Sequence, residues 1–148
     1  MGLKFGKVLH LGIVVRDLEK AVKIYEEELG IGPWKIESAS PFFDDKLVND
    51  GVGLNIRTAI FRGDGYEIEL CTPTGPGVFQ EWLDQHGPSL HHVKLESDAT
   101  YEEVVGMAER TSGRKPYLDV RWPDGKPLVA YADLLEETGL LLEIGADQ

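Results

Sequence analysis

Hydrophobic and polar residues in the first half of the chain predict one strand, one helix and three more strands. Residues 8–15 (VLHLGIVV) are rich in β-branched residues, which favour strands. Apolar residues then recur with helical spacing over 17–30, where Asp17 and Gly30 are typical of a helix start and stop. Residues 34–39, 54–61 and 66–71 predict strands, with a loop at 41–51 and a glycine-rich hairpin turn at 63–65.

The same order returns in the second half. The breaker cluster PTGPG at 73–77 and a short helix at 78–86 separate the two halves. A strand follows at 90–96, and Thr100 and Glu103 form a capping box that opens a helix ending at Gly113. Residues 117–121, 128–132 and 140–144 predict strands, with turns at 123–125 and 137–139. The chain therefore contains the order β-α-β-β-β twice, which indicates an internal duplication and an α+β fold.

The length of 148 residues is enough for one domain with a sizeable core. We expect a single domain over 1–148. Its first module spans about 7–73, a linker with the short helix spans about 74–88, and the second module spans about 89–146.

The charge of the chain excludes some partners. There are 26 acidic and 15 basic side chains, so the formal net charge is −11. Such a chain repels phosphate backbones and anionic lipid surfaces, and no apolar run approaches the roughly 20 residues of a membrane span. The first residues lack a signal-peptide pattern, and the single Cys71 cannot form an intramolecular disulfide. We expect a cytoplasmic protein with no nucleic-acid or membrane partner.

Four ionisable residues occupy matching places in the two halves. His10 and His92 lie in the first strand of each half, and Glu69 and Glu143 lie in the last. Alternation along each strand leaves an apolar face for the helix and a second face that carries the ionisable group. If the halves face each other, two imidazoles and two carboxylates meet in one cup, where a divalent cation satisfies them. A mixed set of four ligands leaves coordination positions open, as in catalytic sites.

The sequence resembles the vicinal oxygen chelate superfamily, which includes glyoxalase I, methylmalonyl-CoA epimerase, extradiol dioxygenases and bleomycin-resistance proteins. The matching segments are HLGIVVRDLEKAVKIYEEELGIGPW, IELCTP, LHHVKLE and TGLLLEIG, and they span nearly the whole chain. The resemblance implies two tandem βαβββ modules that form a cupped, incomplete mixed β-barrel. It also implies a small-molecule substrate and a homodimer.

Carried over by position, the metal ligands of this superfamily fall on His10, Glu69, His92 and Glu143. The ion would be Co, Ni, Zn, Mn or Mg. Glu143 and Glu69 are then candidate catalytic residues that move a proton, and Glu67, which shares the strand face of Glu69, is a third.

Three further residues are candidates for binding the substrate. Lys94 shares a strand face with His92, where it pairs with an acid or holds an anionic substrate. Tyr131 lines the pocket or packs, and Trp122 is a rim or packing residue.

Among the reactions of the superfamily, the resemblance favours a metal-dependent isomerase or epimerase like methylmalonyl-CoA epimerase. Asp50-Gly51-Val52, the ELCTP ending and the pattern from Gly87 to His92 carry this match. One position departs from it, because the epimerase places a glutamate where this chain has Leu54 and Asn55. The alternatives are a glyoxalase I-like lyase acting on a hydroxy-ketone or thiol adduct, a non-catalytic binding or resistance module, and an Fe(II) ring-cleaving dioxygenase.

Overall fold

The computed structural model describes residues 2–37 and 55–145, which form eight strands and four helices. In chain order these elements are β1 (Phe5–Val14), α1 (Leu18–Glu27), β2 (Trp34–Glu37), β3 (Ile56–Arg62), β4 (Glu67–Pro73), α2 (Val78–His86), β5 (Ser89–Ser97), α3 (Tyr101–Ser112), β6 (Leu118–Arg121), β7 (Pro127–Leu134), α4 (Leu135–Thr138) and β8 (Leu140–Gly145). The α+β fold class with two tandem βαβββ modules is confirmed. The predicted loop at 41–51 and the last residues of the strand predicted at 34–39 lie outside the described residues.

The described residues divide into two compact units. The α1 unit comprises residues 10–37 and 55–91, and the α3 unit comprises residues 2–9 and 92–145. β1 and β5 each contribute residues to both units, because the division falls within these two strands. The module boundaries expected from the sequence stay a prediction.

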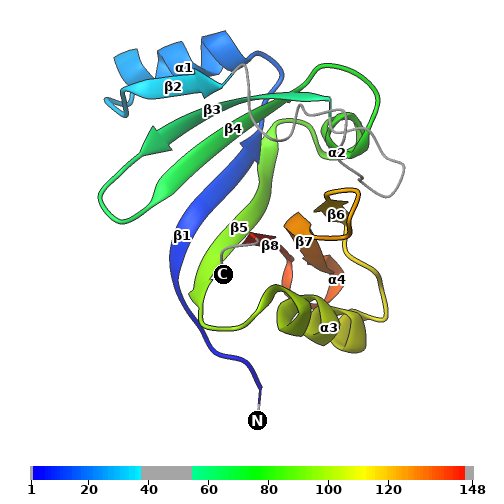
Figure 1. Ribbon diagram of the computed structural model, residues 1–148. Coiled ribbons are helices and arrows are strands. Elements are labelled where there is room, and N and C mark those ends of the chain that lie inside the picture. Colours follow the sequence, from blue (N-terminus) through cyan, green and yellow to red (C-terminus); the bar gives the residue numbers. More distant parts are fainter. Residues whose placement is uncertain (1, 38–54, 146–148) are drawn as a thin grey trace. The chain divides into compact units, whose positions relative to one another are not determined.

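In the α1 unit the strands follow the order β2-β3-β4-β1, and only the β1–β4 pair is parallel. The side chain of Asp17 accepts a hydrogen bond from the backbone of Lys20 at 3.0 Å, which confirms the predicted start of α1. α1 packs on β3 and β4 (Figure 1). Five buried residues form the centre of this core: Leu18, Val22, Ala59, Ile68 and Leu70.

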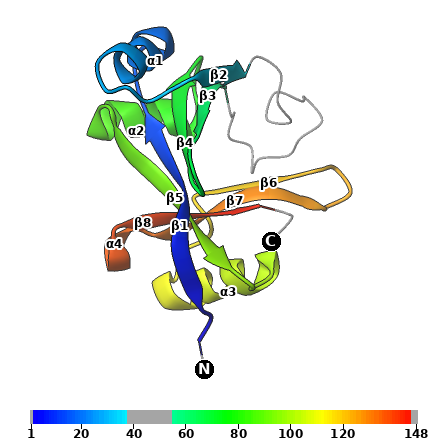
Figure 2. The same ribbon diagram turned by 90° about the vertical axis from the view of Figure 1, so that its left-hand side faces the viewer.

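In the α3 unit the order is β5-β8-β7-β6, and the β5–β8 pair is parallel. The predicted capping box is present, since Glu103 N donates to Thr100 Oγ1 at 3.2 Å and Thr100 N donates to Glu103 Oε1 at 3.3 Å. α3 packs against β7 and β8 (Figure 2). Gly113 ends the helix in the left-handed region, with φ 74°.

The sequence pattern missed α4. Glu137 and Thr138, which we expected in a turn over 137–139, belong to this four-residue helix. The guanidinium of Arg114 donates two hydrogen bonds to Glu137 of this helix, at 3.1 and 2.7 Å. Thr138 also donates to the carbonyl of Leu134 at 2.9 Å. Contacts with a residue more than 20 positions away are invisible to local periodicity.

None of the helices within the described residues combines the length and the apolar character needed to cross a membrane.

Candidate metal-ligand pairs

The α1 unit brings together the first of the predicted histidine–carboxylate pairs. β1 and β4 run parallel, and His10 lies opposite Glu67 in the register. Glu69 is two residues further along β4 on the same strand face. His10 Nε2 and Glu69 Oε1 are 3.6 Å apart, and each side chain is 10% exposed. The pair is thus built by one parallel ladder and lies almost fully buried.

The α3 unit builds a second pair in the same way. β5 and β8 run parallel, with Val93 opposite Leu142, so the register places His92 opposite Leu141. Glu143 is again two residues beyond the register partner of the histidine. His92 Nε2 and Glu143 Oε1 are 3.7 Å apart, and the two side chains are 0% and 10% exposed. The duplication therefore extends from the order of elements to the offset between histidine and acid.

The geometry of each pair fits a divalent cation. Separations of 3.6 and 3.7 Å exceed the 2.7–3.2 Å of a usual N–H···O hydrogen bond. Two ligands that each bind one ion at about 2.0–2.2 Å lie up to roughly 4.2 Å apart. Imidazole nitrogen with carboxylate oxygen is also a donor set that first-row divalent metals accept. Each pair thus offers two ligand atoms at a spacing one ion can span.

Neighbouring side chains hold both pairs in place. Cys71 Sγ donates to Glu69 Oε1 at 3.3 Å, which fixes one oxygen of that carboxylate. The rings of His92 and Tyr131 stack with centroids 4.5 Å apart and an interplanar angle of 26°. Our sequence analysis missed the contact of Cys71, although its position two residues after Glu69 places both on one strand face. Tyr131, a candidate substrate-binding residue, is only 3% exposed and packs on the histidine.

Glu67 lies in a different environment from Glu69 although the two share a strand face. Its side chain is 39% exposed, and Arg62 Nε lies 3.4 Å from Glu67 Oε2. Arg62 is the cross-strand neighbour of Glu67 at the end of the β3–β4 hairpin. Glu67 therefore starts β4 as a partly exposed, paired acid, whereas Glu69 is buried beside His10.

The two adjacent histidines of β5 face opposite sides. His91 stacks on Phe79 of α2 with centroids 4.9 Å apart and meets the ring of Trp82 edge-on at 4.7 Å. It is 3% exposed, so it belongs to the packing between β5 and α2. His92 points to the other face, where Glu143 lies.

The remaining candidates occupy the α3 unit. Lys94 is half-buried, and its Nζ lies beside Gly145, 3.6 Å from where a Cβ would stand. Trp122 lies at the start of the β6–β7 turn and makes two of its backbone hydrogen bonds. Its N–H donates to the carbonyl of Lys126, and its carbonyl accepts from the N–H of Gly125. The structure thus places Lys94 on the face of His92 and Trp122 at a hairpin.

Asn55 has a structural task at the place where the epimerase resemblance implies a glutamate. Its Nδ2 donates to the carbonyl of Pro76 at 2.7 Å, and its own carbonyl accepts from Thr74 at 2.7 Å. Its φ of 28° lies in a region that asparagine tolerates better than most residues. Asn55 therefore anchors the segment before α2. Leu54 lies outside the described residues.

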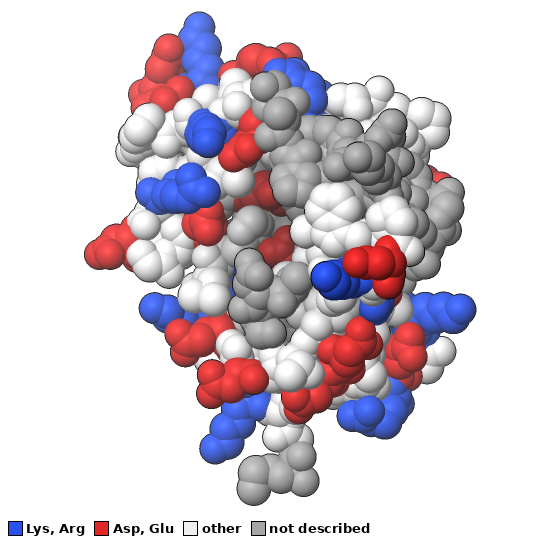
Figure 3. Space-filling view, in the orientation of Figure 1, with Lys and Arg blue, Asp and Glu red and all other residues white. Residues whose placement is uncertain are grey.

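On the face seen in Figure 3, lysine and arginine side chains lie among aspartate and glutamate side chains rather than in one basic patch.

Comparison with protein families gives one match over most of the chain. The family model described as Glyoxalase/Bleomycin resistance protein/Dioxygenase superfamily matches residues 9–113. No curated protein matches.

Several solved structures share the fold. Methylmalonyl-CoA epimerase from Mycobacterium tuberculosis is 22% identical with a TM-score of 0.63, over 93% of this chain and 85% of that one. A hypothetical protein from Bacillus halodurans is 18% identical with a TM-score of 0.65, over 93% and 91%. A variant of the Streptomyces coelicolor methylmalonyl-CoA epimerase, in complex with 2-nitronate-propionyl-CoA, is 18% identical with a TM-score of 0.63, over 95% and 93%. At these identities the likeness is one of fold.

Proposed function

The chain belongs to the glyoxalase/bleomycin resistance protein/dioxygenase superfamily, and on this premise we propose that it is a metal-dependent isomerase that moves a proton next to a carbonyl group. The observation that carries the proposal is the repeated pair of a buried histidine and a buried carboxylate, at 3.6 Å in one unit and 3.7 Å in the other. A duplicated fold alone does not require that both copies keep a histidine on the first strand and a glutamate two residues beyond the register partner of that histidine.

In this proposal His10, Glu69, His92 and Glu143 together hold one divalent cation, of Co, Ni, Zn, Mn or Mg. Imidazole nitrogens and carboxylate oxygens are ligands that these metals share, so the set does not select among them. When bound, such a cation acts as a Lewis acid toward the carbonyl oxygen of a substrate. Cys71 and Tyr131 are positioning residues, because each contacts one ligand side chain.

The proton is moved by the carboxylates of the chain. Glu143 or Glu69 accepts it from the substrate carbon and returns it, because a carboxylate within reach of the acidic carbon serves as general base and then as general acid. Their 10% exposure limits the access of bulk water to the transferred proton. Glu67, at 39% exposure beside Arg62, has a supporting role at the edge.

Methylmalonyl-CoA is our first candidate substrate. Fold relatives include methylmalonyl-CoA epimerases, one of them in complex with methylmalonyl-CoA.

A glyoxalase I-like lyase is the second candidate reaction. Asn55 favours it, because the side chain of Asn55 donates a hydrogen bond to the carbonyl of Pro76 and the lyase needs no acid at this position. A homodimer is proposed from the superfamily alone.

Hydrogen exchange tests the proposal. The purified protein is loaded with Mn²⁺ or Co²⁺ and incubated with methylmalonyl-CoA in D₂O, and deuterium at C2 is followed by NMR. We expect metal-dependent exchange that Glu143→Gln abolishes and that EDTA suppresses. Exchange that survives EDTA contradicts the metal role.

A second substrate separates the two candidate reactions. If methylmalonyl-CoA shows no exchange while the hemithioacetal of methylglyoxal and glutathione is converted, the lyase replaces the epimerase. If neither reacts and the protein binds no metal, the enzyme proposal fails and a binding module remains.

A further inference from the structure

The outer face of α1 carries lysines toward its start and a glutamate toward its end. α1 packs on β3 and β4 with Leu18 and Val22 buried, so its other side faces away from the sheet (Figures 1 and 2). Lys20, Lys23 and Glu27 follow one another at spacings of three and four residues, which makes them neighbours on a helix surface. All three are exposed. The outer face of α1 is therefore positive toward one end and negative toward the other.

The end of α1 carries charges that the helix itself disfavours. The last turn of a helix has a partial negative charge, so basic side chains stabilise it and acidic ones destabilise it. In α1, Glu26 and Glu27 lie in the last turn and Glu28 is the cap residue, whereas no basic residue lies in that turn. A partner that supplies cations at this end would offset the unfavourable interaction.

The charged side chains on this face have no ion-pair partner in the part of the chain that the structure describes. None of the ion pairs there includes Lys20, Lys23 or Glu27. Glu19 shows the contrast within the same helix, because Arg57 of β3 donates a hydrogen bond to its carboxylate. The outer face of α1 therefore presents its charges to solvent or to another molecule.

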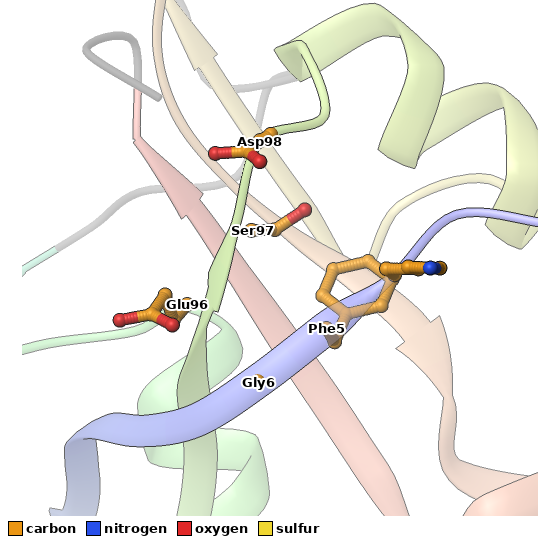
Figure 4. A pocket seen from close by; sticks show the side chains of 6 residues that line it. Phe5, Gly6, Glu96, Ser97 and Asp98 are labelled. Atoms are coloured by element: carbon orange, nitrogen blue, oxygen red, sulfur yellow. The ribbon is translucent and has the colours of Figure 1, made fainter.

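In other places charges of opposite sign lie together. In the surface pocket of the α3 unit shown in Figure 4, Lys4 contributes to the same lining as Glu96 and Asp98. On the face seen in Figure 3, basic side chains likewise lie among acidic ones. The separation of the two signs along α1 is thus a local feature of this helix.

Apolar side chains are exposed beside these charges. Ile24 is 45% exposed and lies four residues after Lys20 and three before Glu27, which places it in the middle of the outer face. Leu29 is 59% exposed, and its backbone N–H donates to the carbonyl of Ile24 at 3.2 Å, so it lies against the last turn. An apolar centre with a charged surround is the usual composition of a protein–protein contact.

We propose that the outer face of α1 is a contact surface between two copies of this chain. In a contact with two-fold symmetry the same patch meets itself. Two antiparallel α1 helices centred near Ile24 bring Lys20 and Lys23 of one copy beside the partner's Glu27, and each of these pairs occurs twice. The two helix dipoles then also run in opposite directions, which is favourable. A face that is positive at one end and negative at the other is complementary to its own copy in this arrangement.

This contact lies away from the candidate metal ligands of the α1 unit. Ile68 and Leu70 pack in the core with α1, and Glu69 between them points to the opposite face of β4. The outer face of α1 and the His10–Glu69 pair are thus on opposite sides of the same sheet. The inference goes beyond the proposed function, in which the homodimer comes from the superfamily alone, and it does not depend on a bound metal.

Sedimentation velocity of the full chain tests whether such a dimer forms. The wild type should dimerise reversibly at about 0.1 M salt. Its dissociation constant should rise by about 10-fold or more at about 1 M salt, because the screening length falls from about 10 Å to about 3 Å and exposed ion pairs weaken. A wild type that stays monomeric at millimolar concentration, or a dimer that is insensitive to salt, overturns the inference.

Two charge-reversed variants locate the contact. Lys20→Glu with Lys23→Glu makes the outer face acidic, and Glu27→Lys with Glu28→Lys makes it basic. Each variant alone should dimerise at least about 100-fold more weakly than the wild type, because like charges then face each other across the axis. An equimolar mixture of the two variants should form a heterodimer. Acids near the start of a helix and bases near its end agree with its dipole, so both variants should keep their fold.

Lys115→Glu with Lys126→Glu is the matched control, because it changes the net charge equally at two exposed lysines of the α3 unit. This control should dimerise like the wild type. Variants of α1 that stay dimeric place the contact on another surface and overturn the inference, as does a mixture that stays monomeric or an equal loss in the control.

Deuterium exchange with methylmalonyl-CoA separates this inference from the proposed function. A wild type that dimerises through α1 but shows no exchange leaves the contact surface standing. A wild type that is monomeric and shows metal-dependent exchange leaves the proposed function standing and overturns the contact surface.

Discussion

The replacement Glu69→Gln separates metal binding from folding. The glutamine has nearly the same shape, and its Oε1 still accepts the hydrogen bond from Cys71 Sγ that now measures 3.3 Å. Because a buried carboxylate is costly to desolvate, its neutral counterpart should leave the metal-free protein at least as stable as the wild type. The ion, however, loses a charged ligand.

The size of the loss follows from binding linkage. Removing partners that only orient a metal ligand weakens metal affinity by about 10- to 100-fold, so removing a ligand should cost at least about 100-fold. At a free metal concentration of about 100 times the wild-type dissociation constant, the wild type gains about 2.7 kcal/mol of unfolding free energy and the variant about 0.4 kcal/mol. For a chain of this size the metal-induced rise in Tm should fall from roughly 5–11 °C to roughly 1–2 °C.

Circular dichroism melting curves with and without metal measure this difference. Glu67→Gln is the matched control, because it removes the same charge from the same strand face, two residues away, at a side chain that is 39% exposed and paired with Arg62. Its metal-induced shift should match the wild type. A full shift in Glu69→Gln, or an equal loss in Glu67→Gln, refutes the assignment of Glu69 as a ligand.

Two further predictions concern stability. Thr100→Ala removes the capping hydrogen bond to Glu103 N and should lower the unfolding free energy by about 1 kcal/mol in urea titrations, whereas Thr100→Ser should not; a silent Thr100→Ala contradicts the role of the cap. Arg114 holds the pKa of Glu137 below its usual value of 4.5 through side-chain hydrogen bonds, so this interaction stabilises the fold above pH 4.5 and is lost as the pH falls through the lowered pKa. Arg114→Met should therefore have a lower Tm than the wild type at pH 7 and nearly the same Tm in acid. A difference in Tm between the two proteins that stays constant with pH would contradict this.

Local sequence was enough to predict most of the helices and strands. The helix caps at Asp17 and Thr100 are interactions between residues three positions apart, so the local order of residues reveals them. Alternation along strands also placed His92 and Lys94 on one face, because a strand reverses its side chains at every residue. The repeated order of elements then indicated which residues correspond in the two halves.

Only the tertiary structure decided what depends on partners distant in sequence. Alternation along β4 assigns Glu67 and Glu69 to the same face. Glu67 lies at the partly exposed end of the hairpin and pairs with Arg62 on β3. Glu69 is buried beside His10 on the parallel strand β1. Glu137 in the short helix α4 likewise accepts a hydrogen bond from Arg114, which lies 23 residues earlier in the chain. The two-residue alternation of a strand fixes the direction of each side chain. The burial of that side chain and its contact partners are set by the chain segments that fold against it.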